Sequence, residues 1–254
     1  MKMKLLLSAM IAAGVATNVQ AQEEEKKEGW TGQGEAGFIS SSGNTDSDSL
    51  NLGLKFAKAG KVWDHEIALA AYQASTEGTD TAENFSAGYT LKRNLTERSN
   101  IFFNLSYLDD EFDGFTEQIS AAVGYAYKFA DGPKVKWEAG AGVGYRDTDE
   151  LFVERDDLTG EIISEVEGDN LGGPTFVLRS DFEAHISETT KFVDNFKAEI
   201  GSDNTYIEND AALFVTISSN FSLKAGYLVR FNTDPADGSD DTDTITSLSL
   251  VYGF

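Results

Sequence analysis

The sequence contains no cysteine, and this absence removes several kinds of protein at once. Without cysteine there is no disulfide framework, no thiolate metal site and no cysteine nucleophile. Histidine is almost as scarce, since His65 and His185 are its only two occurrences. Lys and Arg number 20 against 43 Asp and Glu, which gives a formal net charge of −23. Nucleic acid is excluded as a partner at this charge, because phosphate binding requires clustered Lys and Arg.

Long apolar runs are also missing from the body of the chain. After Ala21 the longest purely apolar run is Ile67–Tyr72, far below the roughly 18 residues that a membrane-spanning helix needs. Proline is limited to Pro133, Pro174 and Pro235. All three fall at the ends of predicted strands or in connections, where a strand ladder tolerates them.

The amino terminus has the pattern of an export signal. Lys2 and Lys4 precede an apolar stretch from Leu5 to Val15, and Val19-Gln20-Ala21 places small residues where a signal peptidase cuts. This predicts a signal peptide over residues 1–21, Sec-type export and cleavage near Ala21. Residues 22–28 are predicted to form a periplasmic linker ahead of the folded domain.

Apolar and polar residues alternate one by one over much of the remaining chain. In the segment 134–147, one face carries Trp137, Ala139, Ala141, Val143 and Tyr145. The other face carries charged or very small residues, and a period of two is that of a β-strand. Twelve such segments lie near residues 30–41, 47–57, 62–74, 83–93, 100–109, 117–129, 134–147, 174–187, 191–202, 206–218, 221–232 and 244–254.

The pattern predicts an all-β fold, a transmembrane antiparallel β-barrel of twelve strands over residues 29–254. An even number of strands and alternating short and long connections are typical of bacterial outer-membrane barrels. The long polar connections include 75–82, 148–173, 203–205 and 233–243, and parity places them on the cell surface. A soluble barrel has the same period, with its apolar side chains inside. Aromatic residues at the ends of the apolar faces, and the alternating end Leu248, Leu250, Tyr252, Phe254, favour the membrane.

Several motifs resemble a known family. They are Gly29-Trp30-Thr31-Gly32 before the first strand, Ser41-Ser42-Gly43-Asn44-Thr45-Asp46, Gly201-Ser202-Asp203-Asn204-Thr205-Tyr206, and Thr242 to Ser247 leading into Leu250 to Phe254. Together they resemble the salt-induced outer-membrane protein family, a domain-of-unknown-function family of proteobacterial barrels. The resemblance implies the barrel fold and an outer-membrane location. It implies no catalytic residue and no cofactor.

Two functions remain open on the sequence: a narrow channel for ions or small polar solutes, and a closed structural barrel of the envelope, either of them linked to salt stress. Charges of both signs fall on the polar face. They set the selectivity of a channel or form neutralising pairs in a closed barrel. The predicted pore-lining residues are Lys136, Glu138, Arg146, Arg179, Asp181, Glu183, Lys224 and Arg230. Gly140, Gly142 and Gly144 lie on the same face inside a strand, so they are small lumen residues and no nucleotide motif.

Two predicted loops are strongly acidic. Residues 147–169 hold ten carboxylates against Arg155 alone, and residues 234–243 add five with no base. The simplest interpretation is that these are solvated loops without a ligand. The functional interpretation is that they bind divalent cations loosely at the lipopolysaccharide surface. The candidate cation ligands are Asp156, Asp157, Asp237, Asp240 and Asp241. Other expected partners are outer-membrane lipid and the barrel-assembly machinery, which would recognise the last strand ending in Phe254.

An outer-membrane hydrolase is the third and most distant possibility. His185 lies near Asp181 and Glu183 in the sequence, which would suit a base beside carboxylates. Both histidines, however, fall at the predicted periplasmic ends of their strands. The sequence therefore predicts that the protein is not an enzyme.

Overall fold

The computed structural model describes residues 29–41, 47–110, 115–155, 162–170, 172–202, 204–235 and 240–254. The predicted signal peptide and linker lie outside these residues. The described part contains no helix that is long and apolar enough to cross a membrane.

The described residues form thirteen β-strands, each built on the alternation seen in the sequence. Their bounds are β1 Thr31–Ser41, β2 Ser47–Lys58, β3 Trp63–Thr76, β4 Thr79–Asn94, β5 Ser99–Asp110, β6 Phe115–Asp131, β7 Val135–Arg155, β8 Ile162–Asn170, β9 Gly173–His185, β10 Thr190–Ile200, β11 Thr205–Thr216, β12 Phe221–Asn232 and β13 Thr242–Gly253.

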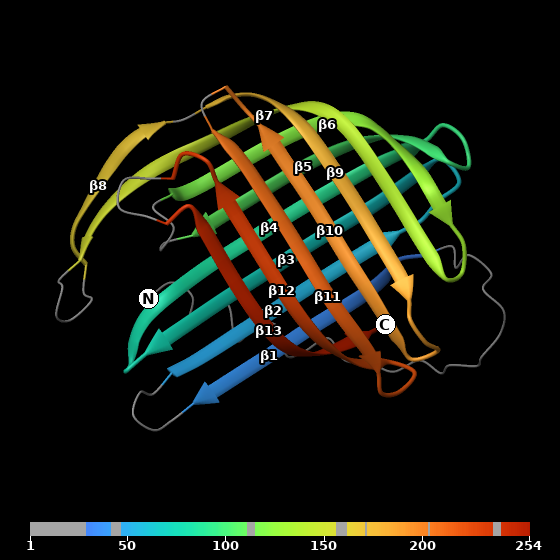
Figure 1. The fold of residues 1–254 in the computed structure, drawn as a ribbon, viewed down its shortest axis with the longest axis horizontal. Coiled ribbons are helices and arrows are strands. Elements are labelled where there is room, and N and C mark those ends of the chain that lie inside the picture. The colour runs from blue at the N-terminus through green and yellow to red at the C-terminus, as the bar shows by residue number, and fades with distance from the viewer. Residues whose placement is uncertain are drawn as a thin grey trace.

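Twelve of these strands close into an antiparallel barrel (Figure 1). Strands that follow one another in the sequence pair with each other, except that β7 pairs with β9 past β8. β1 pairs with β13 and closes the ring. Gly32 and Phe254 exchange backbone hydrogen bonds of 2.8 and 2.9 Å at this seam. The predicted twelve-stranded barrel is confirmed.

The thirteenth strand corrects one prediction. Residues 148–173 are not a simple loop, because β7 continues beyond the barrel to Arg155 and pairs there with β8. Figure 1 shows this hairpin extending past the barrel at the left. The stretches Leu151–Val153 and Ile162–Ile163 contain the β-branched and aromatic residues that favour strands. The high density of charge around them concealed this preference.

Two other connections have bounds that differ from those predicted. Glu77 and Gly78 have φ angles of +53° and +77°, so they form a two-residue turn of the kind that suits hairpin twist. β3 and β4 therefore run almost to this turn, and the predicted eight-residue connection 75–82 is wrong. β10 and β11 are joined by a tight turn in which the Gly201 N–H donates to the Asn204 carbonyl at 3.0 Å.

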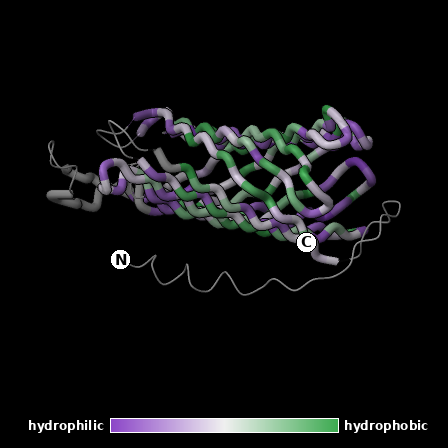
Figure 2. The backbone as a smooth tube through the Cα atoms, turned by 90° about the horizontal axis from the view of Figure 1, so that it is seen from below, coloured by the Kyte–Doolittle hydropathy of each residue, from purple (hydrophilic) through white to green (hydrophobic). Residues whose placement is uncertain are grey.

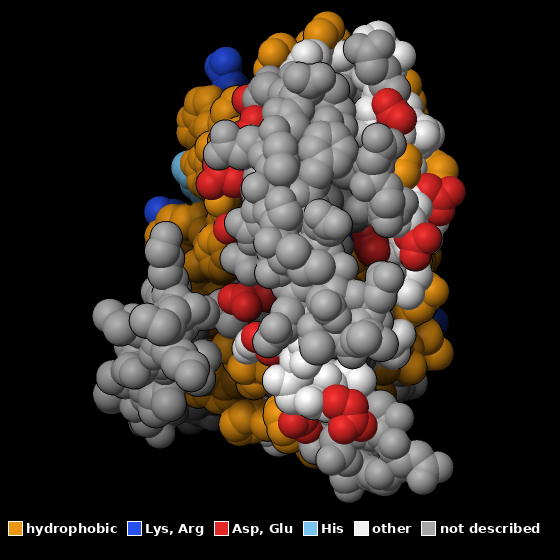
Figure 3. Space-filling view, turned by 90° about the vertical axis from the view of Figure 1, so that its left-hand side faces the viewer, with side chains coloured by type: hydrophobic (Ala, Val, Ile, Leu, Met, Phe, Trp, Pro, Cys, Tyr) orange, Lys and Arg blue, Asp and Glu red, His pale blue; other side chains and the backbone are white. Residues whose placement is uncertain are grey.

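We name the two ends of the barrel by their connections. The turn end carries residues 59–62, 95–98, 132–134, 186–189 and 217–220, and the loop end carries the others, including the β7–β8 hairpin. Figure 3 looks onto the loop end and shows many Asp and Glu side chains there. The described acidic residues exposed at this end include Asp48, Glu77, Asp80, Glu117, Asp149, Asp234, Asp240 and Asp241.

The outer face is apolar and has aromatic residues towards both ends. Trp63 of β3, at the turn end, is 46% exposed, whereas Val143 and Tyr145 of β7, towards the loop end, are 62% and 52% exposed. Exposed aromatics near the turn end include Trp30, Phe129, Trp137, Phe221, Tyr252 and Phe254, and those near the loop end include Phe38, Phe85 and Phe176. Figure 2 shows hydrophobic backbone positions through the middle of the barrel and hydrophilic ones at its ends.

The barrel is flattened, broad in Figure 1 and thin in Figure 2. Glycines let neighbouring strands approach closely at two places in the wall, which we call corners. A Cβ atom on Gly124 of β6 or Gly142 of β7 would overlap the backbone of the other strand, and one on Gly37 of β1 would overlap the backbone of β13. These two corners lie half-way around the ring from each other. The walls β1–β6 and β7–β13 therefore face each other closely across the lumen.

Candidate functional site in the barrel lumen

The structure places all eight predicted pore-lining residues on the inner face. Each alternates with an outward apolar or small neighbour, as in Lys136-Trp137-Glu138 of β7. Every inward Lys and Arg of the described strands lies within 4.0 Å of a carboxylate oxygen. These ten residues are Lys55, Lys92, Lys128, Lys136, Arg146, Arg179, Lys191, Lys197, Lys224 and Arg230.

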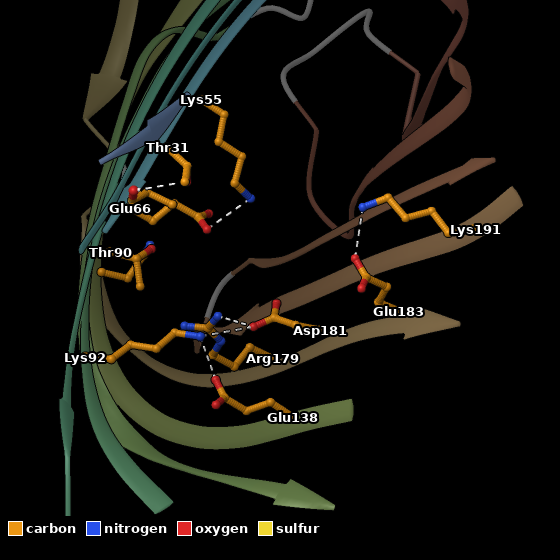
Figure 4. A network of polar contacts seen from close by, with 12 residues as sticks. Thr31, Lys55, Glu66, Thr90, Lys92, Glu138, Arg179, Asp181, Glu183 and Lys191 are labelled. Atoms are coloured by element: carbon orange, nitrogen blue, oxygen red, sulfur yellow. Dashed lines mark hydrogen bonds and ion pairs between the residues drawn. The ribbon is translucent and has the colours of Figure 1, made fainter. Parts of the chain in front are cut away.

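One network joins the two walls near the turn end (Figure 4). Lys92 of β4 reaches across to Glu138 of β7, with Nζ 2.7 Å from Oε1, and lies 3.7 Å from Asp181 of β9. The second oxygen of Glu138 accepts a hydrogen bond of 2.8 Å from the Asn100 amide of β5. Arg179 pairs with Asp181 on the same strand. Burial of these charges is possible because each has a partner of opposite sign.

Apolar packing reinforces this network. The Phe102 ring of β5 is 1% exposed, and the guanidinium of Arg179 lies over it, 5.1 Å from the ring centroid. The ring also fills the space left by Gly124 at the β6–β7 corner. Phe102 therefore closes this side of the lumen, although its inward orientation was not among the sequence predictions.

A second network crosses the lumen near the loop end. Arg230 of β12 donates from Nη1 to Asp110 of β5 at 3.2 Å and from Nε to Glu208 of β11 at 3.3 Å. β5 and β12 lie on opposite sides of the ring, so this contact spans the barrel. Arg230 is 6% exposed and Asp110 is 8% exposed. The Tyr206 hydroxyl donates to the same Glu208 carboxylate at 2.7 Å.

Arg146 extends this second network towards the β6–β7 corner. Its guanidinium lies over the Tyr206 ring, 4.1 Å from the centroid, and donates to the Gln118 amide oxygen. Glu199 is 2% exposed and accepts a hydrogen bond of 2.7 Å from the Ser120 hydroxyl. Its other oxygen lies 4.0 Å from Arg146 Nε. These contacts tie β6, β7, β10 and β11 together.

The lumen still encloses a cavity of about 340 Å³. Its lining is mixed, with small and polar residues from β3 to β5 on one wall and charged residues from β10 to β12 on the other. The lining includes Ala68, Tyr72, Asn84, Gly88, Glu208, Asp210, Lys224 and Arg230. A Cβ atom built on Gly88 meets no other atom within 4 Å. Lys224 closes one side by pairing with Glu35 of β1 at 3.1 Å.

Sequence reasoning missed several of these residues. Asp110 belongs to β5, whereas the sequence placed it in a connection. Tyr206, Glu208 and Asp210 of β11 face inward, but Asn209 on the outer face obscured the alternation that would have revealed them. The signal that could have found them is the strict period of two counted back from Phe214.

The two histidines lie on opposite faces of the barrel wall. His65 faces outward, where its Nδ1 lies 2.9 Å from the Tyr89 hydroxyl and its ring lies near Trp30. His185 is at the turn end, with Nε2 3.4 Å from Glu183, whose carboxylate also binds Lys191 at 3.0 Å. Both positions match the predicted strand ends.

The structure describes only two of the five candidate cation ligands. Asp156, Asp157 and Asp237 lie outside the described residues. Asp240 and Asp241 are exposed at the loop end, and the Asp241 carboxylate accepts a hydrogen bond of 2.8 Å from the Thr242 hydroxyl. No group of three or more acidic or histidine ligands suited to a metal ion occurs within the described ranges.

A closed barrel with an apolar outer face, aromatic residues at both ends and a charged interior is a transmembrane β-barrel of the kind found in bacterial outer membranes. The family of this chain is shown by a match of its sequence to a family model. Residues 34–254 match the model of the family described as "Protein of unknown function, DUF481", and the chain belongs to that family. This confirms the resemblance seen in the motifs.

Individual proteins are similar to this chain in sequence or in fold. The uncharacterized protein YdiY of Escherichia coli (strain K12) is 26% identical over 268 residues, covering 98% of this chain and 99% of that protein. Among solved structures, the NanC porin gives a TM-score of 0.44 at 10% identity and covers 89% of this chain and 98% of its own. The translocator domain of the autotransporter NalP from Neisseria meningitidis gives 0.46 at 10% identity, covering 89% and 86%. These structural likenesses concern the fold alone.

Proposed function

We propose that the barrel is a narrow passage for ions or small polar solutes across the outer membrane. The observation that carries the proposal is the cavity of about 340 Å³ in the lumen, whose mixed lining includes several charged side chains. It lies between the Lys92–Glu138 network and the Arg230–Asp110 network, and several of its charged groups are only partly buried. Fixed charges of both signs beside a confined aqueous space are the means by which a channel selects its ions.

Asp210 supports this proposal in particular. Its carboxylate lines the cavity, and the ion pairs found among the described residues do not include it. A carboxylate that faces the lumen without a directly bonded cation attracts mobile cations from solution. Together with the acidic loop end, it gives a solute path that favours cations over anions.

The second candidate function is a closed structural barrel of the envelope, with acidic loops that attract cations. One observation favours it: the Arg146–Glu199 and Arg230–Asp110 ion pairs are almost fully buried, and the second pair ties opposite walls together. Such pairs stiffen a barrel without opening a path. The two functions differ in whether the cavity connects to both sides of the membrane.

Planar-bilayer recording with two matched variants tests the passage. Gly88→Trp places a large ring in the cavity, because Gly88 faces the lumen and has free space beside it. Ala87→Trp places the same ring on the lipid side of the same strand. Wild type and Ala87→Trp should show stepwise openings, and Gly88→Trp should show much smaller ones. Silence of the wild type over a broad range of voltage and salt would favour the structural barrel.

The route to the membrane is part of the proposal. Residues 1–21 direct Sec-type export and are removed near Ala21, residues 22–28 remain in the periplasm, and the loop end faces the cell surface. The seam between β1 and β13 supports recognition of the carboxy-terminal strand by the barrel-assembly machinery, since Phe254 is an integral part of that seam. At the surface, the exposed acidic residues attract divalent cations that also bind lipopolysaccharide. A role under salt stress fits the same acidic surface.

A further inference from the structure

The outer wall carries a hydrogen-bonded polar pair in the middle of its apolar surface. Asp194 of β10 and Asn209 of β11 are diagonal neighbours across the β10–β11 ladder, where Asp194 pairs with Ala211 and Asn209 with Phe196. Both face outward, because the lumen residues of these strands occupy the alternating positions. The Asn209 amide donates to Asp194 Oδ2 at 3.0 Å.

The surroundings place this pair within the lipid-facing band. Along β10 the outward neighbours of Asp194 are Phe192 and Phe196, and along β11 those of Asn209 are Ile207 and Ala211. Hydrocarbon offers no hydrogen bonds, so ionisable groups at such a depth are rare and commonly mark a functional site. Within the described residues, Asp194 Oδ1 and the second amide N–H of Asn209 have no hydrogen-bond partner.

A hollow lies beside the pair on the same wall. It has a volume of about 290 Å³, and its lining includes Phe192, Ala211, Leu213, Ala225 and Tyr227. Three alanines and one glycine form part of this lining next to three bulky side chains. Small residues between large ones allow a second apolar surface to approach closely, as they do where membrane segments associate.

We propose that this wall, formed by β10 to β12, is the interface between two copies of the chain. Each copy presents one free acceptor on Asp194 and one free donor on Asn209, so the patch is self-complementary. A twofold axis beside the pair lets Asn209 of each copy donate to Asp194 of the other, as an isologous interface requires. The bulky residues around one hollow then pack against the other hollow. A lipid acyl chain could fill the hollow but would leave both polar groups without partners.

The test is the stoichiometry of the full-length mature barrel in lipid bilayers, measured by single-molecule photobleaching over a range of dilution. Wild type should be dimeric. Asp194→Leu combined with Asn209→Leu removes both polar groups, so neither is left unpaired in lipid and the barrel should fold as well as wild type. The double variant should dissociate at a concentration about tenfold higher or more, which corresponds to about 1.4 kcal/mol. Monomeric wild type, or a double variant that dimerises as well as wild type, would overturn the proposal.

Single cysteines test the location of the interface, since the natural chain has none. Ala211→Cys places a thiol on this wall, and Ala87→Cys places one on β4, half-way around the ring. Bifunctional thiol cross-linking should join two copies of the first variant and leave the second as a monomer. Equal cross-linking of the two variants would show that the contact is not specific to this wall. The heat-dependent gel shift of each variant confirms that its barrel has formed.

Discussion

Removing Arg230 should be one of the most damaging single changes in the lumen. Its guanidinium is the shared partner of Asp110 at 3.2 Å and Glu208 at 3.3 Å. Arg230→Met keeps much of the volume but leaves two carboxylates in a largely buried site without their cation. Stripping one partner from a buried ionic network costs about 3–5 kcal/mol. The free energy of unfolding should fall by that amount.

The same geometry predicts an order among three variants. Asp110→Asn removes one charge but leaves Arg230 paired with Glu208. The free energy of unfolding should therefore fall only by the contribution of one charge-assisted hydrogen bond, about 1.5–3 kcal/mol. Lys55→Met breaks the pair with Glu66 at 3.0 Å, but both side chains are more than 40% exposed. Such a pair is worth under about 1 kcal/mol.

Reversible unfolding in urea, with the barrel folded into lipid vesicles and followed by tryptophan fluorescence, measures all three free energies. Arg230→Met should have the lowest transition midpoint, followed by Asp110→Asn and then Lys55→Met. If Arg230→Met unfolds at the same urea concentration as Lys55→Met, the loop-end network does not hold the walls together.

Three further outcomes follow from the fold and the charge distribution. Deleting residues 150–167 joins the β7–β8 ladder near the pair Asp149 and Asn170. The deletion should weaken a cation preference measured by reversal potentials at about 0.1 M salt, because fixed charges there act over roughly 10 Å. It should have little effect at about 1 M salt, because charges there act over only about 3 Å. A preference for anions, or one unchanged by the deletion, would place selectivity in the lumen. Protease added to intact cells should cut within 150–169, and cutting only after permeabilisation would reverse the orientation. Gly142→Leu should abolish the heat-dependent gel shift because its side chain meets the β6 backbone, whereas Gly88→Ala should retain it.

The sequence alone was sufficient to predict the barrel and its twelve strands. Alternation in segments such as 134–147 reflects a physical constraint, since each strand has one face in lipid and one in the lumen. The same period put Glu138, Arg146 and Arg230 on the inner face. It also placed both histidines at strand ends, where they are found.

Contacts across the lumen were decided only by the tertiary structure. Periodicity says that Arg230 and Asp110 face inward or lie near a strand end, but not that they meet. Their meeting depends on the flattening of the barrel (Figure 2), which brings opposite walls within reach of each other's side chains. Strand order places β5 opposite β12 in the ring. No local sequence pattern encodes the distance between these two strands. The turn at Glu77-Gly78 and the β7–β8 extension were missed for a related reason: polar residues suit a loop and an exposed hairpin equally well, and only backbone pairing distinguishes them.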